Sequence, residues 1–250
     1  MQKSVCLHIG NRLKCEAQCP QLKVHDKPMM NVQSTKYLGD IITEDAGVRK
    51  TVEDRRAKGW GRVSQILGMV DTFTTGKYRT MIGLKLREVR LINSMLFNME
   101  AWSAISDKEL IILEQVDHAF LRSLMGAQAK VQIEFLFLEF GILKIRHLLI
   151  IRRLMYHYSI LKRDQNETIF KIYKKQKELH IKNDWFAMLL KDFEFIGEEL
   201  EDTIISQYSK NQYKNIIKSK VRKAAFELYN NSKKVKFVKL ITQRWKHKVI

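Results

Sequence analysis

Apolar and polar residues alternate in the first part of this chain. Over residues 4–9 every second position is apolar, the period that a half-buried strand shows. Residues 22–24 and 29–32 flank a turn-forming sequence, which predicts a hairpin. Residues 37–42 would form the last strand. We therefore expect a small antiparallel β fragment at the N-terminus.

The period changes to that of a helix after Ala46. One stripe of the first expected helix consists of residues three and four apart, namely Val48, Val52, Trp60, Val63, Ile66, Leu67 and Val70. Gly59 falls within this stripe, where the missing side chain would let another segment approach closely. Both prolines, Pro20 and Pro28, precede this region, so no proline interrupts the helices that follow.

Further helices are expected at 77–102, 106–125, 132–140, 143–162, 167–179, 184–195 and 213–229. The inward residues of the first of these would be Tyr78, Ile82, Val89, Ile92, Leu96 and Met99. Expected caps are a capping box from Ser106 to Glu109, a stop at Gly126, and N-caps at Asn183 or Asp184 and at Ser209.

The predicted fold class is mainly α, with the small antiparallel β fragment followed by a helical bundle. Residues 1–43 would form the β fragment. Residues 44–164 would form the bundle, and residues 165–250 a basic helical extension.

The chain has 45 Lys and Arg against 27 Asp and Glu, a formal net charge of +18. Such an excess favours a polyanionic partner, either a phosphate backbone or an anionic membrane. A membrane is not expected, because the core needs the apolar helix faces and no apolar run approaches the ~18 residues of a span. Arg55, Lys58 and Arg62 are three and four apart and would form a ridge that contacts phosphates. The alternative is that the charges only solvate the helices.

Four tryptophans could stack on bases. The helical register of Trp60, Trp102 and Trp185 favours core packing instead, whereas Trp245 lies in a basic segment and is the candidate for stacking. Acidic residues become rare after Glu201, where the cations Lys210, Lys214, Lys218, Lys220, Arg222 and Lys223 cluster.

Three cysteines, Cys6, Cys15 and Cys19, form no disulfide framework, which fits a reducing, intracellular compartment. Two of them lie in a Cys-x3-Cys spacing that could hold zinc together with His8 or His25. Because no second regular pair accompanies this spacing, ordinary strand and loop cysteines are favoured. No metal site is predicted.

No known catalytic motif is present. The sequence contains no phosphate-binding loop of the Walker type, no nucleophile elbow and no His-Glu-x-x-His. His147 and His157 lie ten residues apart on one expected helix without an acid beside them, so we expect them to be partly buried or solvated. No catalytic residue is predicted.

An ordered series of short segments resembles a known family. The segments are Lys3-Ser4 before Leu7-His8-Ile9-Gly10, Tyr37-Leu38-Gly39-Asp40, a helix bearing Arg55 to Gly59, Glu100-Ala101-Trp102, Leu113 to Asp117, Ile133-Glu134, Leu138 to Gly141, and Arg152 to Tyr156. In this order they resemble the C-terminal part of the reverse transcriptase of LINE-like, non-LTR retrotransposons. The resemblance covers about residues 3–158.

The resemblance implies a site that grips primer–template RNA or DNA. Its residues would be Lys3, Tyr37, Leu38, Gly39, Arg55, Lys58 and Arg62. Tyr37, Leu38 and Gly39 would position the primer terminus. Arg55, Lys58 and Arg62, on the helices that form the thumb in this family, would contact phosphates. Lys3 would lie near the incoming nucleotide. The parent enzyme would use magnesium for target-primed reverse transcription in the nucleus, with palm and fingers elsewhere in the same polyprotein.

The resemblance does not extend to catalysis. Polymerisation needs paired carboxylates that hold two divalent ions, and this sequence contains no Asp-Asp pair. We therefore expect the chain to bind nucleic acid without polymerising it. Two alternatives remain open, a domesticated or degenerate RNA- or DNA-binding module and a helical protein-interaction scaffold whose charge is incidental.

Overall fold

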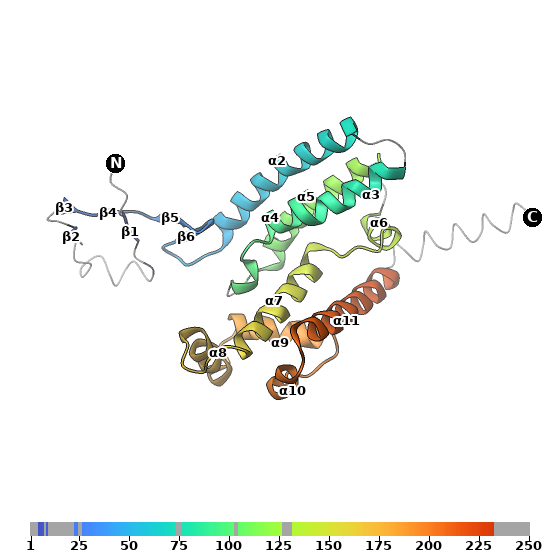
Figure 1. The fold of residues 1–250 in the computed structure, drawn as a ribbon. Helices are drawn as coiled ribbons and strands as arrows, with labels where there is room; N and C mark the ends of the chain where they lie inside the picture. Colours follow the sequence, from blue (N-terminus) through green and yellow to red (C-terminus); the bar gives the residue numbers. More distant parts are fainter. Residues whose placement is uncertain are drawn as a thin grey trace, which may run out of the picture.

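The computed structural model describes residues 5–7, 9, 23–24, 27–73, 77–102, 105–126 and 132–232. Helices dominate in these ranges, which confirms the predicted mainly α class (Figure 1). The strands are β1 (Val5–Cys6), β2 (Lys23–Val24), β3 (Lys27–Pro28), β4 (Met30–Asn31), β5 (Ser34–Tyr37) and β6 (Asp40–Thr43).

The helical elements follow the strands. They are α2 (Arg49–Phe73), α3 (Lys77–Leu86), the π-helical η1 (Arg87–Ile92), α4 (Asn93–Met95), the 3₁₀ turn η2 (Met99–Ala101), α5 (Asp107–Met125), α6 (Ile133–Glu139), α7 (Ile145–Leu161), α8 (Thr168–Leu179), α9 (Trp185–Phe195), α10 (Asp202–Gln207) and α11 (Lys210–Asn231). In Figure 1, α2, α3 and α5 lie together in one half, and α7 leads from them to α8, α9, α10 and α11.

The strands form separate two-stranded pairs instead of one antiparallel sheet. The predicted hairpin is present with a different partner strand, since β2 pairs with β3, whose residues were expected in the turn, whereas β4 pairs in parallel with β1. The predicted strand over residues 37–42 is wrong, because the chain reverses at Leu38 and Gly39. Their φ angles of +47° and +95° place both residues in the left-handed region that tight hairpin turns require. Strands β5 and β6 therefore form a hairpin with Leu38 and Gly39 at its tip.

Helix α2 buries most of the predicted stripe against α4 and α5. The prediction for Trp60 is wrong, because this side chain is 40% exposed. Near Trp60 the buried face of α2 is formed by Arg55 and Gly59. A Cβ on Gly59 would lie 2.9 Å from Met95 Sδ and 3.1 Å from Val116 Cγ1. The close approach predicted at Gly59 is thus confirmed.

The expected helix over residues 77–102 is interrupted by the π-helical turn η1. Ile92, Leu96 and Met99 are buried as predicted, but Tyr78 and Val89 are exposed. A π turn adds a residue to the turn and so shifts the helix face that points inward. This shift explains the two errors.

The capping predictions are confirmed. Ser106 and Glu109 form the capping box of α5, and Gly126 ends this helix in the left-handed conformation. Asp184 caps α9, and Ser209 caps α11 through a second capping box. Helix α10 was not predicted, since its six residues are too few for a periodic signal.

Within the described ranges the core has two apolar clusters. One lies among α2, α4, α5, α6 and the first turns of α7, and the other among the rest of α7 and α8 to α11. Helices α7 and α11 contribute to both clusters, through Leu149 and Ala225 in the first and Leu154 and Val221 in the second. The division of the chain at residues 43 and 164 stays a prediction.

Two glycines of α2 test the close approach of the helices. Gly59→Ala should lower the free energy of unfolding by about 1–2 kcal/mol, because Met95 and Val116 must move to accommodate the methyl group. The matched control is Gly61→Ala, where the new Cβ meets open space. That variant should be more stable by about 0.5–1 kcal/mol. Urea denaturation measures both, and equal effects would contradict the packing at Gly59.

Candidate nucleic-acid interface

The tip of the β5–β6 hairpin presents two apolar side chains to solvent. Tyr37 is 63% exposed and Leu38 is 74% exposed. Beside the tip lies a concavity of about 310 Å³, lined by residues of the hairpin, the start of α2, Asn98 and Trp102. The tip is therefore available to a ligand, and its role in positioning a primer terminus stays a prediction.

Arg55 is buried and anchors the hairpin to α2. Its side chain is only 5% exposed, and Nη2 donates to Asp40 Oδ1 at 2.6 Å. Nη1 donates to the carbonyl oxygen of Ser94 at 3.2 Å, and the guanidinium lies 5.3 Å from the centre of the Phe97 ring. Arg55 lies on the same face of α2 as Val52 and Gly59, at the point where this face meets Asp40 and Ser94.

Further bonds attach the hairpin to the helices. Asp40 Oδ2 accepts a hydrogen bond from Asn98 Nδ2 at 2.9 Å. The Thr51 hydroxyl both donates to the carbonyl oxygen of Ile41 and accepts from its amide, each at 2.9 Å. Because these partners come from α2 and from the turn after α4, the position of the hairpin tip is fixed relative to α2.

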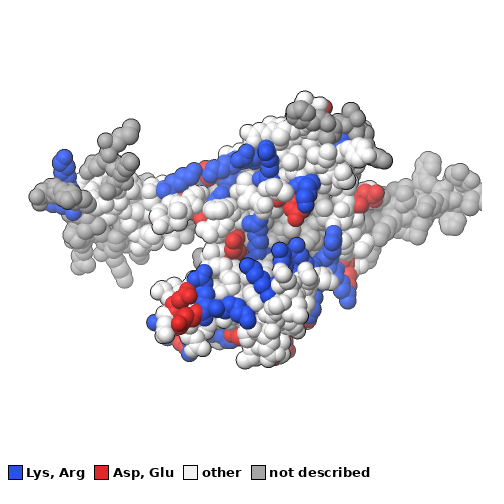
Figure 2. Space-filling view, viewed as in Figure 1, with Lys and Arg blue, Asp and Glu red and all other residues white. Residues whose placement is uncertain are grey.

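Lys58 and Arg62 lie on the exposed side of α2. Lys58 pairs with Asp54 one turn away, and Arg62 donates to Gln65 at 2.9 Å. Lys50 and Arg56 are also exposed, and neither is paired with a carboxylate in the described part of the chain. Figure 2 shows Lys and Arg gathered along α2. Two of the three predicted ridge residues are thus at the surface.

A second basic surface, which we call the basic cleft, lies between α3, η1 and α4 on one side and α7 and α11 on the other. Its volume is about 500 Å³. Its basic residues are Arg87, Arg152, Lys214, Lys218 and Arg222, and its aliphatic residues are Leu84, Ile92, Ile142, Leu143, Leu148, Ile151 and Met155. The sequence showed the basic composition of α11 but no site. The spacing of four between Lys214, Lys218 and Arg222 was the available signal.

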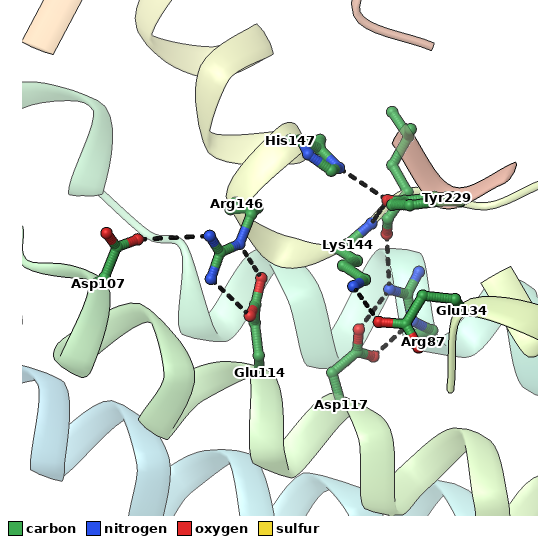
Figure 3. A network of polar contacts seen from close by, with 10 residues as sticks. Arg87, Asp107, Glu114, Asp117, Glu134, Lys144, Arg146, His147 and Tyr229 are labelled. Atoms are coloured by element: carbon green, nitrogen blue, oxygen red, sulfur yellow. Dashed lines mark hydrogen bonds and ion pairs between the residues drawn. The ribbon is translucent and has the colours of Figure 1, made fainter. Parts of the chain in front are cut away.

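A polar network fixes the helices that frame the basic cleft (Figure 3). Arg87 donates from Nε and Nη2 to the two carboxylate oxygens of Asp117, each at 2.6 Å, and from Nη2 to the carbonyl oxygen of Leu143 at 3.0 Å. The Tyr229 hydroxyl accepts from the amide of Lys144 at 3.0 Å and lies 2.7 Å from His147 Nδ1. The start of α7 is therefore held to both η1 and α11.

The same network continues along α5. Arg146 Nε donates to Glu114 at 2.8 Å and Nη1 to Asp107 at 3.3 Å, while Lys144 pairs with Glu134 of α6 at 2.8 Å. These ion pairs join α5, α6 and α7.

The two histidines of α7 are fully buried, which corrects the expectation that they are partly buried or solvated. His147 is 1% exposed and His157 is 0% exposed. His157 has an acid beside it after all, since its Nε2 lies 3.3 Å from Asp202 Oδ1 and 3.1 Å from the Tyr173 hydroxyl. Burial lowers the pKa of His157 despite the opposing effect of Asp202. The acid comes from α10, which is distant in sequence.

Several candidate residues lie outside the described residues. They are Lys3, His8, Cys15, Cys19, His25 and Trp245. Within the described ranges, no three His, Cys, Asp or Glu side chains come together as a metal site would require.

Trp185 is buried as predicted and donates to the carbonyl oxygen of Glu100 at 2.7 Å. None of the described helices has the length and apolar character to cross a bilayer.

Comparisons with known proteins add no identification. No family model, no curated protein and no solved structure matches this chain.

Removing Arg55 tests its role as an anchor. Arg55→Met keeps aliphatic packing but leaves Asp40 without its cation, so the free energy of unfolding should fall by about 2–3 kcal/mol. Arg62→Met, on the exposed side of the same helix, should change it by less than about 0.5 kcal/mol. Adding Asp40→Asn to Arg55→Met should restore part of the lost free energy of unfolding. Chemical denaturation measures all three variants. Equal stability of the two single variants would contradict the anchor.

The environment of His147 predicts a pH dependence of stability. Burial, with Arg146 and Lys144 nearby, lowers the pKa of His147 from 6.5 to about 4. Between these values the unfolded chain binds a proton that the folded chain does not, so the free energy of unfolding should fall as the pH is lowered. The slope from this group is at most about 1.4 kcal/mol per pH unit. His147→Gln, which keeps an acceptor for Tyr229, should flatten this part of the profile, and an unchanged slope would contradict the assignment.

Proposed function

We propose that this chain binds nucleic acid through the phosphate backbone, without reading the sequence. We further propose that it is the part of a LINE-like reverse transcriptase that grips the primer–template. The second proposal rests on the order of the segments from Lys3 to Tyr156. The proposal of binding through the phosphate backbone rests in addition on the surface that the described residues form.

The observation that carries the binding proposal is the coupling of the hairpin tip to α2. The Arg55–Asp40 pair and the bonds of Thr51 hold the apolar tip beside the exposed cations of α2. A rigid edge that offers ring and aliphatic surface next to cations suits a nucleic-acid end, because bases pack on apolar surface while phosphates attract cations. Tyr37 and Leu38 would supply the apolar contact.

The cations on α2 that would contact phosphates differ partly from those predicted. Arg56, the next residue along α2, is exposed and would take the role that was predicted for Arg55. Lys58 already pairs with Asp54, so it would have to exchange this partner for a phosphate. Such exposed ion pairs contribute little to stability, so the exchange costs little.

We do not propose that this chain catalyses polymerisation. The magnesium of the parent enzyme would need clustered carboxylates, and no such cluster exists among the described residues. Polymerisation would depend on palm and fingers supplied by another part of the parent protein, and the site of action would be the nucleus.

Charge reversal on α2 tests the proposal. The triple variant Arg56→Glu, Lys58→Glu and Arg62→Glu should weaken binding of a labelled duplex at least about tenfold at low salt. For the unmodified chain, affinity should fall steeply between about 50 and 200 mM salt, and loss of three phosphate contacts should reduce the slope of log K against log salt by about 2–3. Fluorescence anisotropy over a salt series measures both.

A control variant reverses two charges elsewhere. Lys171 and Lys174 are exposed on α8, and the described residues offer them no carboxylate partner. Lys171→Glu with Lys174→Glu should leave the salt slope nearly unchanged. If the chain binds no duplex at low salt, or if the control weakens binding as much as the α2 variant, the proposal fails.

A further inference from the structure

The basic cleft has an asymmetric charge pattern. Lys214, Lys218 and Arg222 lie along its α11 wall at intervals of four residues, which is about 6 Å along a helix. The opposite wall, formed by η1 and α4, presents Glu88 and Asn93. A row of cations parallel to the helix axis thus follows the α11 wall, whereas the cation of the opposite wall is Arg87, which is paired with Asp117.

Only part of this charge is free. Arg87 forms an ion pair with Asp117. Arg152 donates to the carbonyl oxygen of Leu96 at 2.9 Å and to Asn93. Arg222 donates to the carbonyl oxygen of Gly141. Lys214 and Lys218 are exposed and have no carboxylate partner in the described part of the chain. In the described part of the chain these two lysines are therefore the cations of the cleft that have neither an ion pair nor a hydrogen bond to the protein.

The floor of the basic cleft is aliphatic. Leu148, Ile151 and Met155, on successive turns of α7, lie between the two walls. Among the described residues no aromatic ring lines the cleft. Surfaces that bind single strands without sequence preference use rings on which bases stack, and this floor has none. Aliphatic floors instead accept the apolar face of a helix, as in grooves that bind amphipathic peptides.

We propose that the basic cleft is a docking site for an acidic amphipathic helix of a partner protein. The leucines or isoleucines of such a helix would pack on the α7 floor, and acidic residues on its flank would pair with Lys214 and Lys218. Because both helices have the same rise per turn, acidic residues four apart match lysines four apart. The net charge of +18 also favours an acidic partner. This site is separate from the hairpin and α2, so it does not rest on the proposed function.

Binding of designed peptides tests the docking site. The probe is a labelled helical peptide of about 15 residues with Leu at i, i+3, i+4 and i+7 spacing and Glu on the flanks. One control peptide replaces each Glu with Gln, and another replaces each Leu with Ser. Fluorescence anisotropy with the full chain should show binding of the probe, and binding at least about tenfold weaker for either control peptide.

Variants of the chain assign the binding to the cleft. Lys214→Glu with Lys218→Glu should weaken binding of the probe at least about tenfold, whereas Lys171→Glu with Lys174→Glu, an equal charge change on α8, should not. Leu148→Ala with Met155→Ala should weaken it through loss of the floor, and thermal melts by circular dichroism establish that each variant folds.

Three results would overturn the proposal. The first is unchanged binding after the α11 charge reversal, which would place the peptide elsewhere. The second is equal binding of the peptide that lacks Leu, which would leave only an anion-binding patch. The third is no binding of the probe while a single-stranded oligonucleotide binds in a manner sensitive to Lys214 and Lys218, which would make the cleft a nucleic-acid site.

Discussion

The buried ion pair between Arg87 and Asp117 is the contact on which the arrangement of the helices depends. Both side chains are almost inaccessible to solvent, at 4% and 1% exposure, and they make two parallel hydrogen bonds. Nη2 of Arg87 also donates to the carbonyl oxygen of Leu143, just before α7 begins. A buried charge pair is costly to desolvate, but removing either partner is costlier still, so the pair constrains which elements can meet. Here it fixes η1, α5 and the start of α7 together.

The π-helical turn places Arg87 for this role. Without the turn, the inward face of the helix that begins at Lys77 would continue through Tyr78 and Val89, both of which are exposed. With it, Arg87, Leu91 and Ile92 point inward. π turns are uncommon and concentrate where a special geometry is required. In this chain the requirement is structural, since the turn places Arg87 where it bonds Asp117 and the carbonyl oxygen of Leu143.

Arginines buried against an aspartate recur in the fold. Arg55 pairs with Asp40 at 2.6 Å and Arg153 with Asp192 at 3.0 Å, each across two different elements. Burial raises the pKa of Asp192 to about 7 against the opposing effect of Arg153. These arginines count toward the charge of +18 but offer nothing to a ligand. The exposed cations of α2 lie beside the apolar hairpin tip, and those of α11 lie beside the aliphatic floor of the cleft.

The sequence by itself determined the helical class, most helix positions and their caps, because capping and periodicity depend on residues within a few positions of one another. The capping boxes at Ser106 and Ser209 are examples. The tertiary structure decided which cations face solvent. Arg55 and Arg62 look alike in a ridge of three- and four-residue spacings, yet one meets Asp40 and Ser94 in the interior while the other stays outside. The basic cleft depends in the same way on tertiary structure, since packing brings Lys214 and Lys218 beside a floor from α7. Local spacing fixes which face of a helix a residue occupies, but only packing between elements fixes what that face meets.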